Sequence, residues 1–224
     1  MKKLMTLFVT IFLVTFAVKA QDTVTIKHNG YTTTYSKSLH YPVLVQWWET
    51  KAKDGCPNPL PRKDQFAPDP QLSSETALQK DYDLANKTHK DKGLKGFDRG
   101  HMCPAASSEC EGSQVLTECF YFSNMAPQYH SLNAGDWKSL ETLERNIAIE
   151  KDSVHVWAGS IGCVEKFGTT CIPTKCWKVI YIVKTKEYQA YIFDNSAEKP
   201  LGLAHWKVNV SDVEKLTGFK FNIK

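Results

Sequence analysis

The stretch Lys95-Gly-Phe-Asp-Arg-Gly-His-Met-Cys-Pro-Ala-Ala-Ser-Ser-Glu109 places four reactive or permissive residues side by side, Asp98-Arg99-Gly100-His101. Arg99 can bind a phosphoryl oxygen through its planar fork of N–H donors, and a neutral imidazole at His101 can accept a proton from water near pH 7. Gly100 between them allows backbone and substrate to approach closely. This order suits chemistry on a phosphate diester, but a charged surface turn has the same composition, so the rest of the chain must decide.

The N-terminus has the order of a secretory signal. Lys2 and Lys3 precede an apolar run from Leu4 to Val18, and the small residue Ala20 stands before Gln21. A run of about 15 residues is short for a membrane anchor, the alternative, because a span needs about 20. We therefore expect a signal peptide over residues 1–20 and a secreted or periplasmic mature protein over residues 21–224.

The mature part, about 204 residues, is long enough for a sizeable hydrophobic core. It shows no repeat, linker or low-complexity segment, which predicts a single domain. The whole chain has 28 basic and 24 acidic residues, and residues 1–20 hold three of the basic ones and no acid. The mature protein is therefore nearly neutral, and any attraction to nucleic acid must come from a local patch.

The seven cysteines all lie in the mature part. In an oxidising compartment they are expected to form disulfides, with at least one thiol left over because seven is odd. Cys163 and Cys171, which bracket a loop containing Gly168, are the pair that we expect to be bonded. A zinc site is the competing use, but the sequence has no Cys-x-x-Cys or His-x-x-x-His pair.

Strand-like and helix-like segments are mixed without regular alternation, which favours an α+β domain over a doubly wound parallel sheet. A proline-rich loop is expected from Lys53 to Ser74. The helical segments are Gly135 to about Glu150, with Asn133 at the cap position, and a short last helix with a capping box at Ser211–Glu214 that ends at Gly218. The predicted strands are 23–27 and 31–35, joined by Asn29-Gly30 as a hairpin, and 41–48, 119–123, 153–158, 177–183 and 188–193.

A lysine-rich segment leads into Arg99. It is open to two interpretations, a basic strip for a phosphate backbone or a solvated loop of mixed charge, because aspartates are interspersed. The lysines are Lys80, Lys87, Lys90, Lys92 and Lys95.

Asn133 and Glu141 are candidates for a metal site. Eight positions on a helix give about 80° of rotation and about 12 Å of rise, so both cannot bind one small ion directly unless the helix start is distorted. Mg²⁺ prefers oxygen ligands and keeps several waters, so Asn133 can bind directly and Glu141 through water. Arg145, four residues after Glu141, is either part of this site or an exposed helical ion pair.

Three blocks of sequence stand in order along the chain. They are Phe97-Asp-Arg-Gly-His-Met-Cys-Pro104, Phe122-Ser-Asn-Met-Ala-Pro-Gln128 and Leu132-Asn-Ala-Gly-Asp-Trp-Lys-Ser-Leu-Glu141. Together they resemble the DNA/RNA non-specific endonucleases, and the resemblance extends upstream to Arg62–Phe66 and covers most of the chain from Tyr41. It implies a ββα-metal (His-Me finger) nuclease of the α+β class, with a mainly antiparallel central sheet flanked by helices.

Carried over position by position, the resemblance implies a role for each site residue. His101 would be the general base that activates water, Asn133 the direct ligand of Mg²⁺ or another divalent cation such as Mn²⁺, and Glu141 the group that holds metal-bound waters. Arg99 and Arg145 would contact the phosphate, with Arg62 a further candidate. Contacts to phosphate carry little base information, so both DNA and RNA are expected substrates.

Other residues of the blocks are expected to support the site. Asp98 would shape the loop, Asn124 and Gln128 would hold the site in place, and His130 is the other histidine expected near the cleft. Cys103 stands where the family more usually has a small residue, and a disulfide at this position would alter the loop. Two alternatives remain: a catalytically silent nucleic-acid-binding domain, and a phosphodiesterase acting on small nucleotides.

Overall fold

The computed structural model describes residues 22–72 and 76–222, so the predicted signal peptide lies outside the described residues. Within these ranges none of the helices is both long and apolar enough to cross a bilayer. The strands are β1 Thr23–Lys27, β2 Thr32–Ser36, β3 Tyr41–Thr50, β4 Phe97–His101, β5 Met125–Tyr129, β6 Ser153–Ile161, β7 Glu165–Phe167, β8 Thr170–Ile172, β9 Lys175–Ile182, β10 Glu187–Asp194 and β11 Lys207–Val208. The helices are α1 Lys51–Asp54, α2 Gln79–Asp91, α3 Ser113–Cys119, α4 Lys138–Lys151, α5 Leu203–Trp206 and α6 Val210–Thr217, with short 3₁₀ turns η1 Ala105–Ser107 and η2 Phe122–Asn124 and a π-helical turn η3 Leu132–Trp137.

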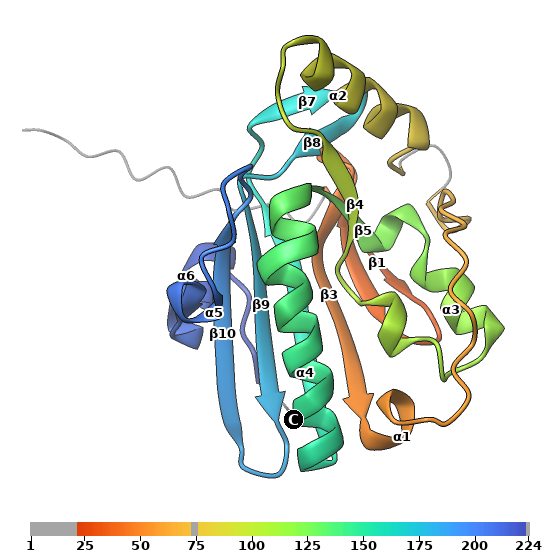
Figure 1. Cartoon of the computed structure of the whole chain (residues 1–224), viewed down its shortest axis with the longest axis vertical. Helices are drawn as coiled ribbons and strands as arrows, with labels where there is room; N and C mark the ends of the chain where they lie inside the picture. The colour runs from red at the N-terminus through yellow and green to blue at the C-terminus, as the bar shows by residue number, and fades with distance from the viewer. Residues whose placement is uncertain (1–21, 73–75, 223–224) are drawn as a thin grey trace, which may run out of the picture.

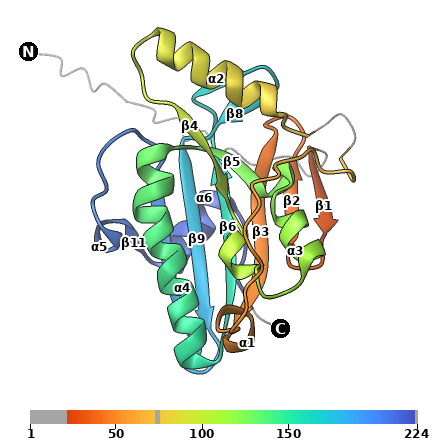
Figure 2. The same ribbon diagram turned by 45° about the vertical axis from the view of Figure 1, so that its right-hand side comes forward.

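Seven strands form one antiparallel sheet in the order β1-β2-β3-β6-β9-β10-β11. Long apolar strands lie at its centre, where both faces are covered. We call the face under α4 the front face and the face under α6 the back face (Figures 1 and 2). The β4–β5 ribbon is a separate two-stranded sheet. It lies on the front face beside α4 (Figure 2). The α+β class with a mainly antiparallel sheet is therefore confirmed.

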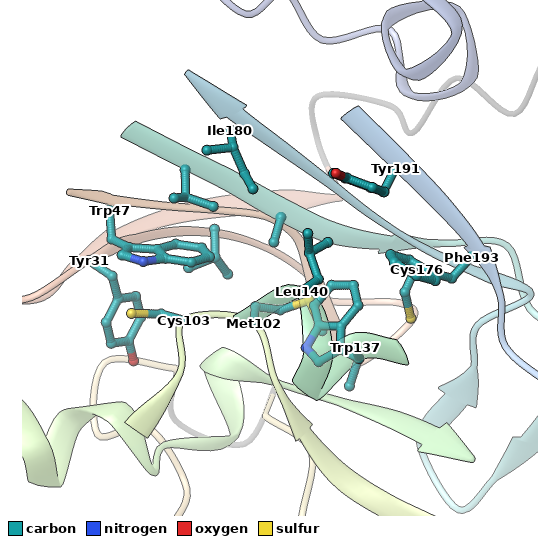
Figure 3. Close-up of a cluster of buried hydrophobic side chains, with 14 of the residues drawn as sticks. Tyr31, Trp47, Met102, Cys103, Trp137, Leu140, Cys176, Ile180, Tyr191 and Phe193 are labelled. Carbon is teal, nitrogen blue, oxygen red and sulfur yellow. The ribbon is translucent and has the colours of Figure 1, made fainter. Parts of the chain in front are cut away.

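The alternation of side chains along the central strands produces two cores. On the front face, Trp47, Leu140 and Ile180 pack with Trp137 (Figure 3). On the back face the buried cluster comprises Trp157, Trp177, Val179, Ala190, Val213 and Phe221. The front core is the one that supports the β4–β5 ribbon, since Met102 and Cys103 at the end of that ribbon belong to it (Figure 3).

Several predicted elements are confirmed and others are wrong. The hairpin, the long strands and the stop at Gly218 are present. Residues 119–123 are not a strand but the end of α3 and the start of η2. The lysine-rich segment is helix α2 rather than a loop. The capping box of the last helix is formed by Asn209 and Asp212, not by Ser211 and Glu214.

Two disulfides join described residues, Cys163–Cys171 as predicted and Cys56–Cys110. Cys103, for which a disulfide was considered, is a buried free thiol, as are Cys119 and Cys176. Cys56, Cys110 and Cys163 thus lie outside the core, Cys171 joins it from β8, and the three free thiols lie in the interior.

Candidate active site

The β4–β5 ribbon followed by η3 and α4 forms the strand–strand–helix unit that carries the predicted residues. In the antiparallel register Asp98 lies opposite Gln128 and His101 opposite Met125. Gly100 is required here, because a Cβ at this position would approach the side-chain oxygen of the buried Gln128 to 2.0 Å. The loop after His101 is held by Asn124, whose side chain accepts from the Cys103 backbone N–H at 2.9 Å and donates to the Cys103 carbonyl at 2.8 Å. Asn124 and Gln128 are thus structural neighbours of the site, as expected.

The start of the predicted helix is distorted, the condition that the sequence analysis set for Asn133 and Glu141 to approach one ion together. Asn133 lies inside η3 and is not a helix cap, and Gly135 departs from helical geometry with φ −102° and ψ −109°. The Asn133 amide donates to Asp98 Oδ2 at 2.9 Å. A carboxylate can only accept, so the NH₂ group must face Asp98. The amide oxygen of Asn133 is thereby left to bind a cation.

Asp98 also bonds His130. The Nδ1 atom of His130 lies 2.8 Å from the same Oδ2 atom that accepts from Asn133. The His130 side chain is 75% exposed, so it stands at the rim of the site. The placement of His130 near the cleft and of Asp98 as a structural partner both agree with the sequence analysis.

His101 is buried between aromatic rings, 5.0 Å from Phe120 in an edge contact and 5.7 Å from Phe66. Its Nε2 atom is buried and has no hydrogen-bond partner among the described residues. Burial, helped by the nearby charges of Arg62 and Arg99, lowers the pKa of His101 to about 3. The imidazole is therefore neutral near pH 7, the form that can accept a proton.

A hollow of about 380 Å³ is lined by Arg62, Arg99, Asp98 and Asn133 among others. His101 is not one of its lining residues, but Phe66, which lines the hollow, contacts the His101 ring. The Arg99 guanidinium lies 4.1 Å over the Phe66 ring and donates to Gln79 at 2.8 Å. Stacking and a hydrogen bond from one side leave the remaining N–H donors of the fork for an anion. The hollow thus presents two guanidinium groups and the metal-ligand candidate on one surface.

Glu141 and Arg145 do not line the hollow. Burial raises the pKa of Glu141, and the charges of Lys178 and Arg145 oppose that rise. Arg145 donates to Thr142 at 3.5 Å, and its Nη1 atom is buried with no partner in the described ranges. Both residues lie on α4. Arg62, Arg99 and Asn133 therefore line the hollow, whereas His101, Glu141 and Arg145 do not.

The basic strip is weaker than its composition suggests. Lys87 is paired with Asp91 at 2.7 Å and Lys92 lies 3.7 Å from Glu165. These contacts are exposed and contribute little to stability. They do, however, offset part of the positive charge along α2.

The sequence analysis assigned no role to two residues that the structure places at the site. Phe66 contacts both Arg99 and His101. Lys178 is fully buried and pairs with the fully buried Glu144 on α4. A signal for Lys178 was present, since it is the one charge in the predicted strand 177–183.

The donor chemistry fits a hydrated divalent cation better than a fully protein-bound one. No group of three or more His, Cys, Asp or Glu side chains within residues 22–72 and 76–222 is arranged to hold a metal. The oriented oxygen of Asn133, with Glu141 on the following helix, offers few oxygen ligands, and Mg²⁺ usually keeps several waters. The residues present therefore fit Mg²⁺.

Comparisons with known proteins agree with this geometry. A nuclease of Serratia marcescens is 32% identical over 164 residues, which cover 67% of this chain and 58% of that protein. Endonuclease G of Bos taurus is 27% identical over 152 residues, or 60% of this chain and 50% of the relative. The chain therefore spans only half to three fifths of these relatives.

A crystal structure of the EndoG/EndoGI complex, which concerns the inhibition of EndoG, shares the fold with a TM-score of 0.73. It is 23% identical and covers 88% of this chain and 84% of that one. The family model for DNA/RNA non-specific endonucleases matches residues 10–224. Because that match spans nearly the whole chain, the protein belongs to the DNA/RNA non-specific endonuclease family.

Proposed function

We propose that the protein is a Mg²⁺-dependent endonuclease that hydrolyses phosphodiester bonds in DNA and RNA. Two observations on the same strand–strand–helix unit carry the proposal: His101 is buried and neutral, and the Asn133 amide is oriented by its bond to Asp98 so that its oxygen is left for a cation. Family membership supports the same chemistry. A proton acceptor and an oriented oxygen ligand are the two parts that hydrolysis of a phosphate diester by activated water needs.

His101 is the general base in this proposal. It accepts a proton from the attacking water while the new bond forms between the water oxygen and phosphorus and the bond to the leaving 3′ oxygen breaks. Arg99 and Arg62, which line the hollow, bind the charged phosphoryl oxygens. When bound, Mg²⁺ supplies positive charge opposite the phosphate, with Asn133 as its direct ligand and Glu141 holding its waters.

Arg145 has a less direct part. Its guanidinium lies on α4 among carboxylates, and its charge opposes the rise in the pKa of Glu141 and of Asp54. We propose that Arg145 keeps Glu141 ionised and reaches the phosphate only as substrate enters. The contacts to phosphate and sugar predict weak sequence preference and an affinity that falls with salt.

Export is also part of the proposal. Residues 1–20 would be removed as a signal peptide, and the mature domain, residues 21–224, would act in a periplasm or outside the cell. The two disulfides support an oxidising compartment.

The test uses purified mature protein with supercoiled plasmid and with RNA, in Mg²⁺ or in EDTA, beside a His101→Ala variant. We expect both polymers to be cut in Mg²⁺ and neither in EDTA. The His101→Ala variant should lose activity by about 10²- to 10⁴-fold. Intact polymer after incubation of the wild type with Mg²⁺ would refute the nuclease proposal, and full activity of His101→Ala would refute the assigned base.

A further inference from the structure

Lys178 is an unusual residue for the centre of an apolar interface. It lies on β9 with 0% of its side chain exposed, between the sheet and α4. Its Nζ atom lies 2.8 Å and 3.1 Å from the two carboxylate oxygens of Glu144, which is also 0% exposed. Its neighbours on the same face of the strand, Cys176 and Ile180, belong to the front core.

Stability alone does not explain this buried pair. Taking two charges out of water is costly, and replacing both by apolar residues of similar volume is often neutral or stabilising. The pair is therefore weak evidence for a contribution to folding. A reason for keeping the charges has to be sought in what they touch.

The Lys178 ammonium lies over two indole rings, 4.6 Å from the centre of Trp137 and 5.2 Å from that of Trp47. Trp137 is the last residue of η3, the turn that contains Asn133. Its indole N–H donates to the backbone carbonyl of His101 at 3.0 Å. One fully buried ring therefore joins the end of β4 to the turn with the metal-ligand candidate.

Trp137 lies between the sheet and the β4–β5 ribbon (Figure 3). A cation over its face and a carbonyl at its edge fix the ring in plane and in rotation. Glu144, one turn beyond Glu141 on the same helix, ties α4 to the same ammonium. Lys178 thus contacts both elements that carry the second half of the candidate site.

We propose that Lys178 is a positioning residue for the active site, which holds Trp137 so that its N–H fixes His101 and holds α4 through Glu144. The expected effect on kcat rests on the proposed function, whereas the placement of His101 through Trp137 does not. Lys178 itself does not touch substrate. Its effect reaches the reacting atoms through Trp137 and His101.

Two matched variants test the path through the ring. Trp137→Phe keeps an aromatic face for Lys178 but removes the N–H that bonds His101. Trp177→Phe removes the same atoms from another tryptophan of 0% exposure, on the back face, whose indole N–H has no partner within the described ranges. A purely structural role for Trp137 predicts similar behaviour of the two variants.

We expect Trp137→Phe to lower kcat by on the order of 10- to 10²-fold with little change in KM, and Trp177→Phe to leave kcat unchanged. In the metal-free protein, the imidazole signals of His101 in a ¹H–¹³C NMR spectrum should shift in Trp137→Phe and not in Trp177→Phe. A folded Trp137→Phe with wild-type kcat and unshifted His101 signals would overturn the proposal.

The charge is tested with Lys178→Met/Glu144→Leu, which removes both partners and leaves no uncompensated ion. This variant should fold, shift the His101 signals and lose kcat to a similar extent. A folded double variant that matches the wild type in both readouts would show that the lysine positions nothing. Should the double variant fail to fold, the Trp137→Phe and Trp177→Phe variants still decide whether Trp137 positions His101.

Failure of the proposed function gives a different result. A wild type that cuts no nucleic acid removes the kcat readout, but the His101 signals of the metal-free variants still report whether Trp137 and Lys178 position that ring.

Discussion

The two faces of the central sheet are built from different chemistry. The front face buries Lys178, Glu144 and Glu49, each with 0% of the residue exposed, together with aromatic rings. The centre of the back face is the apolar cluster that includes Trp177 and Val213. Apolar packing is sufficient to attach α6 to the sheet, so the ions under α4 are not needed to hold two layers together. Buried charge therefore marks the face that carries the candidate site.

The largest expected difference between the faces is in activity. His101 and His155 are both largely buried histidines whose pKa is lowered by burial, to about 3 and to about 4. His101→Ala should lower kcat by about 10²- to 10⁴-fold. His155→Ala, at the edge of the back face, should not change it. Plasmid and RNA cleavage in Mg²⁺ measures kcat for both variants. An equal loss of kcat in the two would show that activity does not distinguish the two faces.

The second prediction concerns the free energy of unfolding. Lys178→Met alone leaves Glu144 buried without its partner and should cost about 3–5 kcal/mol. Adding Glu144→Leu should restore most of that loss, because it removes the uncompensated charge. Urea denaturation of the two variants and the wild type measures this non-additivity. Additive losses would mean that each side chain acts through its own packing.

A substitution in the apolar core of the back face should lower the free energy of unfolding and leave kcat unchanged. Val213 on α6 has 0% exposure, and Val213→Ala removes two methyl groups at a cost of about 2 kcal/mol. Activity measured well below the melting temperature should equal that of the wild type. A fall in kcat would show that the back face also sets the geometry of the site.

The smallest expected effect is the dependence of stability on pH through Asp54. Burial and the charge of Glu49 raise the pKa of Asp54 from its ordinary value of 3.8 to about 7. Its folded pKa lies above its unfolded one, so the folded state binds the proton more tightly, and stability is lost as pH rises from about 4 to about 7. Asp54→Asn should therefore stabilise the protein at pH 8 by on the order of 1 kcal/mol, after allowance for solvent screening, and have no such effect near pH 4. Thermal melts at the two pH values test this, and an equal shift at both would contradict it.

Local patterns were sufficient for much of the fold. Asn29-Gly30 between alternating segments predicts the hairpin, and Gly218 ends the last helix in a left-handed conformation, φ 78°. The short loop with Gly168 between Cys163 and Cys171 favoured their disulfide, which the structure contains. These features depend on neighbours in sequence, so they can be predicted from it.

The errors arise where distant contacts override local preference. Residues 119–123 are rich in aromatic residues typical of a strand, but Asn124 binds the backbone of Cys103 and of Cys119 and imposes a turn. The cap predicted at Asn133 fails for a similar reason. A Cβ at Gly135 would lie 2.5 Å from the Pro200 side chain, and Asp136 accepts from the backbone N–H groups of Leu201 and Gly202. The segment around Pro200 therefore packs against the distorted turn and is bonded to it.

The candidate site shows the same division. His101, Asn133 and Glu141 could be named from motif and resemblance, and Asp98 as a structural partner. Other contacts join distant segments and could not be read from spacing. The bond from Trp137 to His101 spans 36 residues, and the pair of Lys178 with Glu144 spans 34. The stacking of Arg99 on Phe66 is a third contact of this kind.

The unit from β4 to α4 spans Phe97 to Lys151, with η1, α3 and η2 between its two strands, while the sheet beneath it joins β3 to β6 across that whole segment. The closing of the β3–β6 pair therefore encloses the unit as one long loop, whose entropy is lost in a single step. The strands inside the unit pair residues 24 to 32 positions apart, whereas β3 and β6 pair residues 103 to 113 positions apart, and contacts of shorter separation form earlier in folding. The segment with the candidate site can thus acquire its own shape first and receive its buried lysine last, when β9 is added to the sheet.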